Sequence, residues 1–190
     1  MVQSSGAGDS GWSVCQMPEF LDQISAAREA RKHLFVWDKN GVCAQLAQFQ
    51  GSHVHDLNLE QDRIAQGVKT KEEVLEKLRK TLIISYRRGN NLMIDIAKTS
   101  PDFVDTFSDS ERFNPNLVFN FAEWQKPANH MPFVREEEKK ADSENSEDGY
   151  ELNPEATLTI VSTAENERDI SAQLAKIPHS AQFLRVIVLG

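Results

Sequence analysis

Residues 90–97, NNLMIDIA, form a nearly continuous apolar run. A strand with one face in water alternates apolar and polar residues, whereas a central strand of a parallel sheet is covered on both faces and is apolar almost throughout. Three further runs have the same character: HLFVWD at 33–38, ATLTIVSTAEN at 156–166 and FLRVIVLG at 183–190. Together these runs predict a buried, mainly parallel sheet.

Helical patterns separate the apolar runs. The clearest one begins with a capping box formed by Thr70 and Glu73, and it ends with Arg87 and Arg88 before Gly89. Its apolar stripe consists of Val74, Leu75, Leu78, Leu82 and Ile83. Weaker patterns predict helices from Pro18 onward and at 42–50, 101–107 and 167–175, and a fifth strand at 52–59.

Strands that alternate with helices predict an α/β fold, here a three-layer sandwich around a mainly parallel five-stranded sheet with right-handed crossovers. At 190 residues, with 39% hydrophobic and 26% charged residues, the chain has the size and composition of one globular domain. We assign this domain to residues 19–190. Residues 1–18 are rich in Ser and Gly, which predicts a flexible N-terminal tail.

The net charge of −8 is concentrated in one segment. Residues 135–155 contain nine acidic and three basic residues, so they hold six of the eight net negative charges. This segment lacks apolar periodicity, and we expect a disordered acidic insert at 135–149 and a hairpin that pairs residues 150–152 with residues 132–134. The rest of the chain has no basic stripe that could neutralise phosphates, so nucleic acid is not an expected partner.

Export and membrane insertion have no signal in the sequence. No apolar run approaches the roughly 20 residues that cross a bilayer, and the start, MVQSSGAGDSGW, lacks the basic and apolar regions of a signal peptide. Cys15 and Cys43 belong to no metal-type cluster, and no disulfide is expected. His53 and His55 have no third ligand placed by the sequence, so we interpret them as exposed edge histidines and expect no metal. These features fit a cytoplasmic protein.

The turn after HLFVWD bears on nucleotide binding. A phosphate loop needs successive backbone N–H groups at a helix N terminus, a Lys that neutralises charge, and a Ser or Thr that holds magnesium. The turn at 38–41, DKNG, lacks the spaced glycines and the Lys-Ser/Thr pair, and its Asp38 carboxylate repels phosphate. The glycines within residues 6–11 follow no strand and precede no Lys. We therefore expect no nucleotide cofactor.

Several local sequences occur in a definite order. RKHLFVWDKNGVCAQLAQFQ at 31–50 reads as a strand, an acidic turn and a helix, and LMIDIA at 92–97 places Asp95 where a Walker-B strand carries its acid. The order continues with SPDFV at 100–104, Tyr150 to Pro154, TLTIVST at 157–163, Asn166, Pro178 and RVIVLG at 185–190. Over residues 31–190 this order resembles the catalytically degenerate ATPase (AAA-type) modules of dynein heavy chains, especially the fifth module of the motor ring.

The resemblance implies a P-loop-NTPase-like core without a functional phosphate loop. In such a core the Walker-B-like strand lies beside the outermost second strand and has the sensor strand on its other side, whereas a domain of flavodoxin or thioredoxin type has another order. Related degenerate modules occur in ankyrin-repeat and calmodulin-motif proteins, so the chain could belong to a longer protein. The expected function is a non-catalytic protein-interaction or structural element with protein partners, in the microtubule or ciliary context that the family implies.

Asp95 leaves an enzymatic alternative open. A carboxylate at the end of a central strand is where such ATPases hold magnesium and orient water. Ile96 replaces the catalytic Glu that would follow, so we interpret Asp95 as a helix cap or an ion-pair partner. Thr163 and Asn166 occupy sensor-like positions but suit a strand-end turn and a helix cap equally well. In a divergent ATP-binding or hydrolysing domain, the nucleotide-binding residues would be Asp38, Lys39, Asn40, Gly41, Asp95, Thr163 and Asn166.

Overall fold

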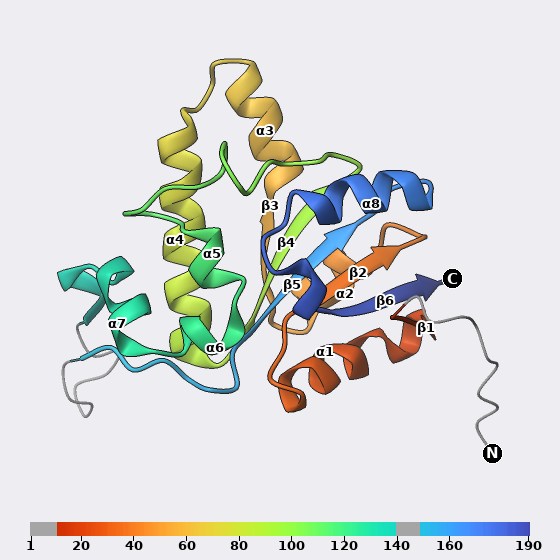
Figure 1. The fold of residues 1–190 in the computed structure, drawn as a ribbon, viewed down its shortest axis with the longest axis horizontal. Helices are drawn as coiled ribbons and strands as arrows, with labels where there is room; N and C mark the ends of the chain where they lie inside the picture. Colours follow the sequence, from red (N-terminus) through yellow and green to blue (C-terminus); the bar gives the residue numbers. More distant parts are fainter. Residues whose placement is uncertain (1–10, 140–148) are drawn as a thin grey trace.

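The computed structural model describes residues 11–139 and 149–190. Within these residues one sheet contains six parallel strands in the order β1-β6-β2-β5-β4-β3 (Figure 1). The strands are β1 (Trp12–Gln16), β2 (Leu34–Asp38), β3 (His53–Asp56), β4 (Asn91–Ala97), β5 (Thr157–Ser162) and β6 (Leu184–Leu189). The prediction of an α/β fold with a parallel sheet is confirmed, whereas the predicted number of five strands is wrong.

The sixth strand lies in the segment predicted as a tail. Strand β1 pairs with β6 from Trp12 opposite Arg185 to Gln16 opposite Leu189. Cys15 is buried, and the Trp12 ring packs edge-on against Phe35 and Trp37 at centroid distances of 5.9 and 6.1 Å. These contacts hold β1 on the sheet, and only residues 1–10 of the predicted tail lie outside the described residues.

The order of the core strands matches the order that the sequence resemblance implies. Strand β4, which carries Asp95, lies between the edge strand β3 and strand β5. Strand β2 lies between β6 and β5, so β3, the next strand along the chain, is not its neighbour in the sheet. In a flavodoxin-type sheet the first strand lies between the second and the third. The observed order therefore excludes a flavodoxin-type arrangement.

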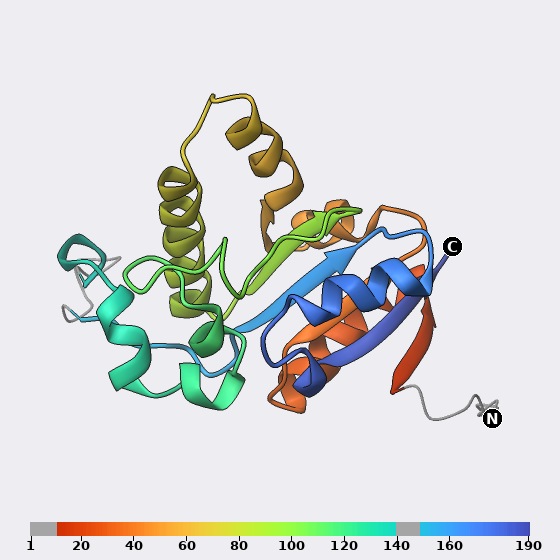
Figure 2. The same ribbon diagram turned by 45° about the horizontal axis from the view of Figure 1, so that its top comes forward.

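Helices cover both faces of the sheet (Figures 1 and 2). On one face lie α1 (Phe20–Glu29) and α2 (Cys43–Phe49), which share an apolar core with Leu34 and Val36 of β2. The larger core on the other face contains Phe35 and Trp37. Four helices contribute to this core: α4 (Lys71–Arg88), α5 (Pro115–Val118), α6 (Phe121–Trp124) and α8 (Glu167–Ala175). The remaining short elements are α7 (Pro127–His130) and the 3₁₀ turns η1 (Met17–Glu19), η2 (Met131–Phe133), η3 (Glu136–Lys139) and η4 (Ser180–Gln182).

The longest helix, α4, begins and ends where the sequence predicts. The Thr70 hydroxyl accepts from the Glu73 N–H, the Glu73 carboxylate accepts from the Thr70 N–H, and Gly89 adopts the left-handed conformation that ends the helix. The predicted apolar stripe is buried together with Arg79 and Tyr86. Helix α3 (Leu57–Ala65) and the first half of α4 project beyond the sheet as a hairpin (Figure 2).

Two arginines of α4 hold the segment that precedes residue 140. The buried Arg79 guanidinium donates to the carboxylates of Glu76 and Glu138 and to the Phe133 carbonyl. About two helical turns further along α4, Arg87 donates to the carbonyls of Glu138 and Gly149 at 2.8 and 3.0 Å. The Gly149 N–H donates to the Lys139 carbonyl at 2.6 Å. The chain therefore leaves and re-enters the described structure at one point on α4.

Three local predictions are wrong. The strand predicted at 52–59 ends at Asp56, because the Asp56 carboxylate accepts from the Leu59 N–H at 2.8 Å and starts α3. Residues 101–107 form turns in place of a helix, since the Asp102 carboxylate takes the N–H groups of Val104 and Asp105. The hairpin between 150–152 and 132–134 does not form, and the Tyr150 hydroxyl donates instead to the Ile83 carbonyl.

The predicted disordered insert at 135–149 falls mostly on residues that the structure does not describe. Residues 140–148 lie outside the described ranges. Before them, Glu136–Lys139 form the turn η3, and Glu138 is bound by Arg79 as above. The acidic segment therefore begins with an ordered turn on α4.

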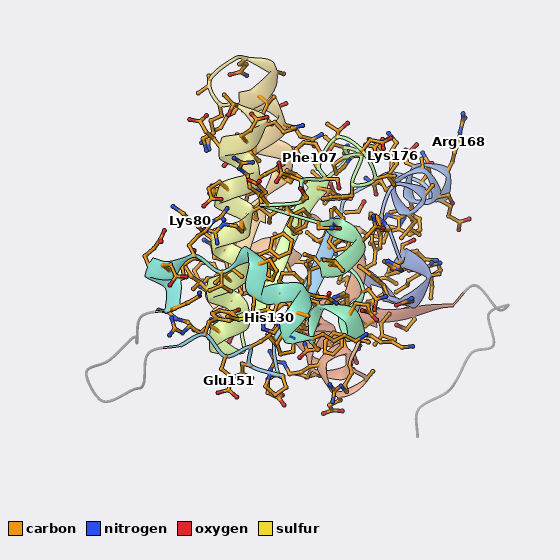
Figure 3. All side chains as sticks on the ribbon, turned by 60° about the vertical axis from the view of Figure 1, so that its left-hand side comes forward. Lys80, Phe107, His130, Glu151, Arg168 and Lys176 are labelled. Atoms are coloured by element: carbon orange, nitrogen blue, oxygen red, sulfur yellow. The ribbon has the colours of Figure 1, made fainter. Side chains whose placement is uncertain are left out.

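We expect Arg79→Ala to lower the free energy of unfolding by about 3 kcal/mol, because the change leaves Glu138 and the Phe133 carbonyl without their buried cation. Arg168→Ala is the matched control, since Arg168, near the start of α8, points away from the molecule (Figure 3) and should change stability by less than about 0.5 kcal/mol. Urea unfolding measures both. Equal stability of the two variants would contradict the assigned role of Arg79.

Candidate functional site

The carboxyl ends of the strands form the candidate site. In open parallel sheets, ligands bind where neighbouring strands send their following helices to opposite faces. Strand β2 continues into α2 on one face, and its neighbour β5 continues into α8 on the other. The structure brings all seven predicted residues to this edge: Asp38, Lys39, Asn40 and Gly41 after β2, Asp95 near the end of β4, and Thr163 and Asn166 after β5.

The loops after β2 and β5 lie close together. Gly41 has a positive φ of 71°, and a Cβ atom placed on it would lie 3.8 Å from the Thr163 methyl group. The Thr163 N–H in turn donates to the Ala97 carbonyl at the end of β4 at 3.0 Å. The edge is therefore one continuous surface from β2 to β4.

Asp38 binds the start of the helix that follows it. The side chain is buried, and its two oxygens accept from the backbone N–H groups of Asn40 at 2.9 Å and Cys43 at 2.7 Å. Cys43 is the first residue of α2, which has seven residues. The N–H groups and the positive end of the helix dipole, which would hold an anion in a phosphate loop, already hold this carboxylate.

Lys39 and Asn40 are also engaged within the fold. The Lys39 ammonium lies 3.2 Å from the centre of the Trp37 ring, and the Trp37 indole N–H donates to the Ala164 carbonyl at 2.7 Å. The Lys39 N–H donates to the Val188 carbonyl of β6. The Asn40 amide packs so closely against Gly190 that a Cβ atom there would lie 2.8 Å from its oxygen. The lysine of this turn therefore lies on an aromatic ring.

Asp95 binds its own strand end. Its carboxylate accepts from the Ala97 N–H at 2.9 Å, in a turn where Ala97 has a positive φ of 46°. Burial raises the pKa of Asp95, and repulsion by Asp56 and Asp38 raises it further. The expectation that Asp95 caps a neighbouring helix or pairs with a base is wrong, because its described hydrogen bond goes to the backbone two residues on. Ile96, the residue after Asp95, is buried.

The residues after β5 have a local role. The Asn166 side chain accepts from the Asp169 N–H at 3.0 Å and caps α8, so its interpretation as a cap is confirmed. A neighbouring pair escaped the sequence analysis: the Ser162 hydroxyl donates to the Gln173 side chain at 2.6 Å, and Gln173 donates to the Thr99 carbonyl at 2.6 Å. The available signal was a glutamine three residues after Ile170, on the inner face of α8.

The histidines of β3 differ from the interpretation as exposed edge residues. His55 is buried, and the His53 ring lies 2.7 Å from the Ser85 hydroxyl of α4. Burial and the nearby Lys77 lower the pKa of His55 to about 4. Within residues 11–139 and 149–190 there is no group of three or more His, Cys, Asp or Glu side chains that could hold a metal ion.

Comparison of the chain with protein-family models, curated proteins and solved structures found no match. No helix in the described part of the chain is long and apolar enough to cross a membrane. The fold and the bonds at the strand ends are therefore the basis for inferring function.

His55 should make the protein acid-sensitive. Its pKa of about 4 in the folded state lies below the ordinary 6.5, so the unfolded chain binds the proton first as the pH falls. The contribution of neutral His55 to the free energy of unfolding is fully present above about pH 6.5. It is lost, by about 3 kcal/mol, as the pH drops toward 4. In His55→Leu this loss should shrink, as measured by urea unfolding across the pH range, and in His53→Gln it should remain. Parallel curves for the wild type and His55→Leu would refute the assignment.

Asp95→Asn should raise the melting temperature at neutral pH. The amide oxygen can still accept from the Ala97 N–H, while the burial cost of the charge and the repulsion by Asp38 and Asp56 disappear. Because the pKa of Asp95 is raised, the wild type regains this stability as the carboxyl protonates, and the difference should vanish in acid. Asp102→Asn is the control, since two N–H bonds lower the pKa of Asp102 and the same change should lower the melting temperature.

Proposed function

We propose that this chain is a non-catalytic ATPase-like module of AAA type that serves as a protein-interaction or structural element. The observation that carries the proposal is the Asp38 carboxylate at the start of α2, bonded to the N–H groups of Asn40 and Cys43. In a working phosphate loop these groups face the phosphates of the nucleotide. Here the protein supplies its own anion at this position.

The charge at the strand ends supports the same conclusion. The carboxylates of Asp38, Asp56 and Asp95 lie close enough to raise the pKa of Asp95. The one lysine of the turn after β2 lies over the Trp37 ring. A triphosphate at this edge would meet the repulsion of these carboxylates. Two lysines at the strand ends are already engaged, Lys39 over the Trp37 ring and Lys98 with the Glu165 carboxylate at 2.7 Å, which weakens the attraction on which phosphate sites depend.

The strand order supports the ATPase-like topology. The Walker-B-like strand β4 lies between the edge strand β3 and the sensor-like strand β5, as in the resemblance to degenerate dynein modules. From that resemblance we infer protein partners within a cytoplasmic, dynein-related, microtubule or ciliary assembly. A degenerate module in such an assembly contributes a rigid body and a surface, while other modules supply the energy of hydrolysis.

One observation favours a second candidate, a divergent ATP-binding or hydrolysing domain that uses Asp95. The carboxyl group lies near the end of a central strand and has a raised pKa, and such groups often belong to catalytic sites. In this candidate Asp95 would hold magnesium, and Thr163 would contact the nucleotide. The requirement is that Asp38 leave the N terminus of α2, which costs the two hydrogen bonds described above.

Titration with ATP and magnesium separates the two candidates. A ligand at about 100 times its dissociation constant adds about 2.7 kcal/mol of stability, which a melting curve resolves easily. We expect no shift in melting temperature at millimolar nucleotide and no release of phosphate. A shift that Asp95→Ala abolishes and Asp102→Ala preserves would establish the nucleotide-binding domain instead.

A further inference from the structure

A cavity of about 270 Å³ lies at the amino ends of β2 and β6. Strand β2 begins with Leu34 opposite Leu184, the first residue of β6. The residues just before these two strands, His33 and Phe183, both line the cavity. The candidate site described above lies at the carboxyl ends of the same sheet. The cavity is therefore separate from that site.

Aromatic rings form the walls of this cavity. Phe119, Phe121 and Phe183 line it together with the His33 imidazole. The centre of the His33 ring lies 5.4 Å from the ring centres of both Phe121 and Phe183, and Phe119 packs edge-on against Phe183 at 6.0 Å. An apolar cavity of about 150 Å³ can hold benzene. This cavity therefore has room for one six-membered ring that carries substituents.

His33 contributes a buried hydrogen-bond acceptor that has no partner. The side chain is 2% exposed, and its Nε2 atom lies 2.9 Å from the Val118 carbonyl oxygen. Because a carbonyl oxygen only accepts, Nε2 carries the proton, and burial lowers the pKa of His33 to about 4, so Nδ1 is an unprotonated acceptor at pH 7. Nδ1 has no hydrogen-bond partner among the described residues. A ligand with an O–H or N–H group would remove the cost of this unpaired acceptor.

The exposed side of the cavity is positively charged. Arg31 and Lys32 line it and are exposed, and none of the described residues that line it is acidic. The central carbon of the Arg31 guanidinium lies 5.9 Å from the centre of the Phe121 ring, at the aromatic wall. Guanidinium groups bind carboxylates through strong charge-assisted hydrogen bonds. The charge therefore favours an anionic ligand.

Arg31 stands at a backbone position where glycine is usual. Helix α1 ends at Glu29, the Arg31 N–H donates to the Arg28 carbonyl at 3.0 Å, and the Lys32 N–H donates to the Ala27 carbonyl at 2.9 Å. In this Schellman motif the residue at the place of Arg31 adopts the left-handed conformation and is most often glycine. Arg31 has a φ of 54°, which strains a residue with a side chain. A strained arginine beside the cavity fits a role for its guanidinium in binding.

We propose that this cavity binds a small aromatic carboxylate that carries a hydroxyl group on its ring. The ring packs against Phe121 and Phe183, the hydroxyl donates to Nδ1 of His33, and the carboxylate meets Arg31 and Lys32. Each part of such a ligand matches one feature of the cavity: the aromatic walls, the unpaired acceptor and the two cations. A neutral ring leaves the cations unused, and a ring without a donor leaves Nδ1 unpaired.

Isothermal titration calorimetry of the full chain with each of the three hydroxybenzoate isomers tests the proposal. We expect at least one isomer to bind one site per chain with a dissociation constant below about 1 mM. Benzoate lacks the donor and phenol lacks the carboxylate, so each should bind about tenfold more weakly than the best isomer. The absence of saturable binding of every isomer at about 10 mM overturns the proposal.

Ala122→Phe tests whether the ligand lies in this cavity. Ala122 is an exposed residue of α6 that lines the cavity, so an added ring should fill the space and abolish binding. Ala172→Phe is the matched control, since Ala172 is exposed on α8 away from the lining residues, and this variant should bind like the wild type. Circular dichroism checks that both variants are folded. Binding that Ala122→Phe retains would refute the assignment to this cavity.

Arg31→Gly separates binding from stability. It should weaken hydroxybenzoate binding about tenfold and leave the affinity for phenol unchanged, because only the carboxylate loses its partner. The same change should raise the melting temperature by about 2 °C, since glycine adopts the positive φ without strain. Arg168→Ala, which removes an exposed arginine of α8, should leave binding unchanged. An unchanged hydroxybenzoate affinity in Arg31→Gly would contradict the proposed orientation of the ligand. None of these results bears on the ATPase-like function, which the nucleotide titration tests separately.

Discussion

Backbone N–H groups at the start of a helix need acceptors, and at α2 the acceptor is a carboxylate from the end of the preceding strand. This bond lets the central strand β2 pass into a helix through a short turn, and it uses the positive end of the helix for the protein's own charge. The surrounding contacts fit the same turn: Lys39 lies on Trp37, and Gly41 approaches Thr163. A working phosphate loop would require all of them to be rebuilt.

The core of the fold could be predicted from the sequence because its signals are local. The apolar runs of β2, β4, β5 and β6 and the capping box of α4 lie within a few residues each. Strand β1 was not predicted, because five residues beside a Ser- and Gly-rich start show little apolar pattern and the partner strand β6 lies at the other end of the chain. The end of β3 at Asp56 was not predicted, because Asp56 was taken as part of the strand, whereas its side chain caps α3.

The sequence predicted where the candidate site lies, but it did not predict most of the hydrogen bonds that its residues make. Residues at strand ends meet at one edge of any parallel sheet, so the sequence could bring Asp38, Asp95 and Thr163 together. Which group each one binds depends on distances of a few tenths of an ångström between elements far apart in sequence. The position of the Lys39 ammonium on Trp37 and the burial of His55 against α4 are of this kind.

The Gly149 N–H donates to the Lys139 carbonyl, and Arg87 donates to the carbonyls of Glu138 and Gly149. These bonds bear on how many residues the chain can hold between Lys139 and Gly149. Both ends of the intervening stretch are fixed side by side on α4, so the described fold demands no particular span of chain between them. Closing a loop costs only about 0.6 kcal/mol more for each doubling of its length. A change in the number of residues between these two anchors therefore leaves the anchors in place and adds only a small loop-closure entropy.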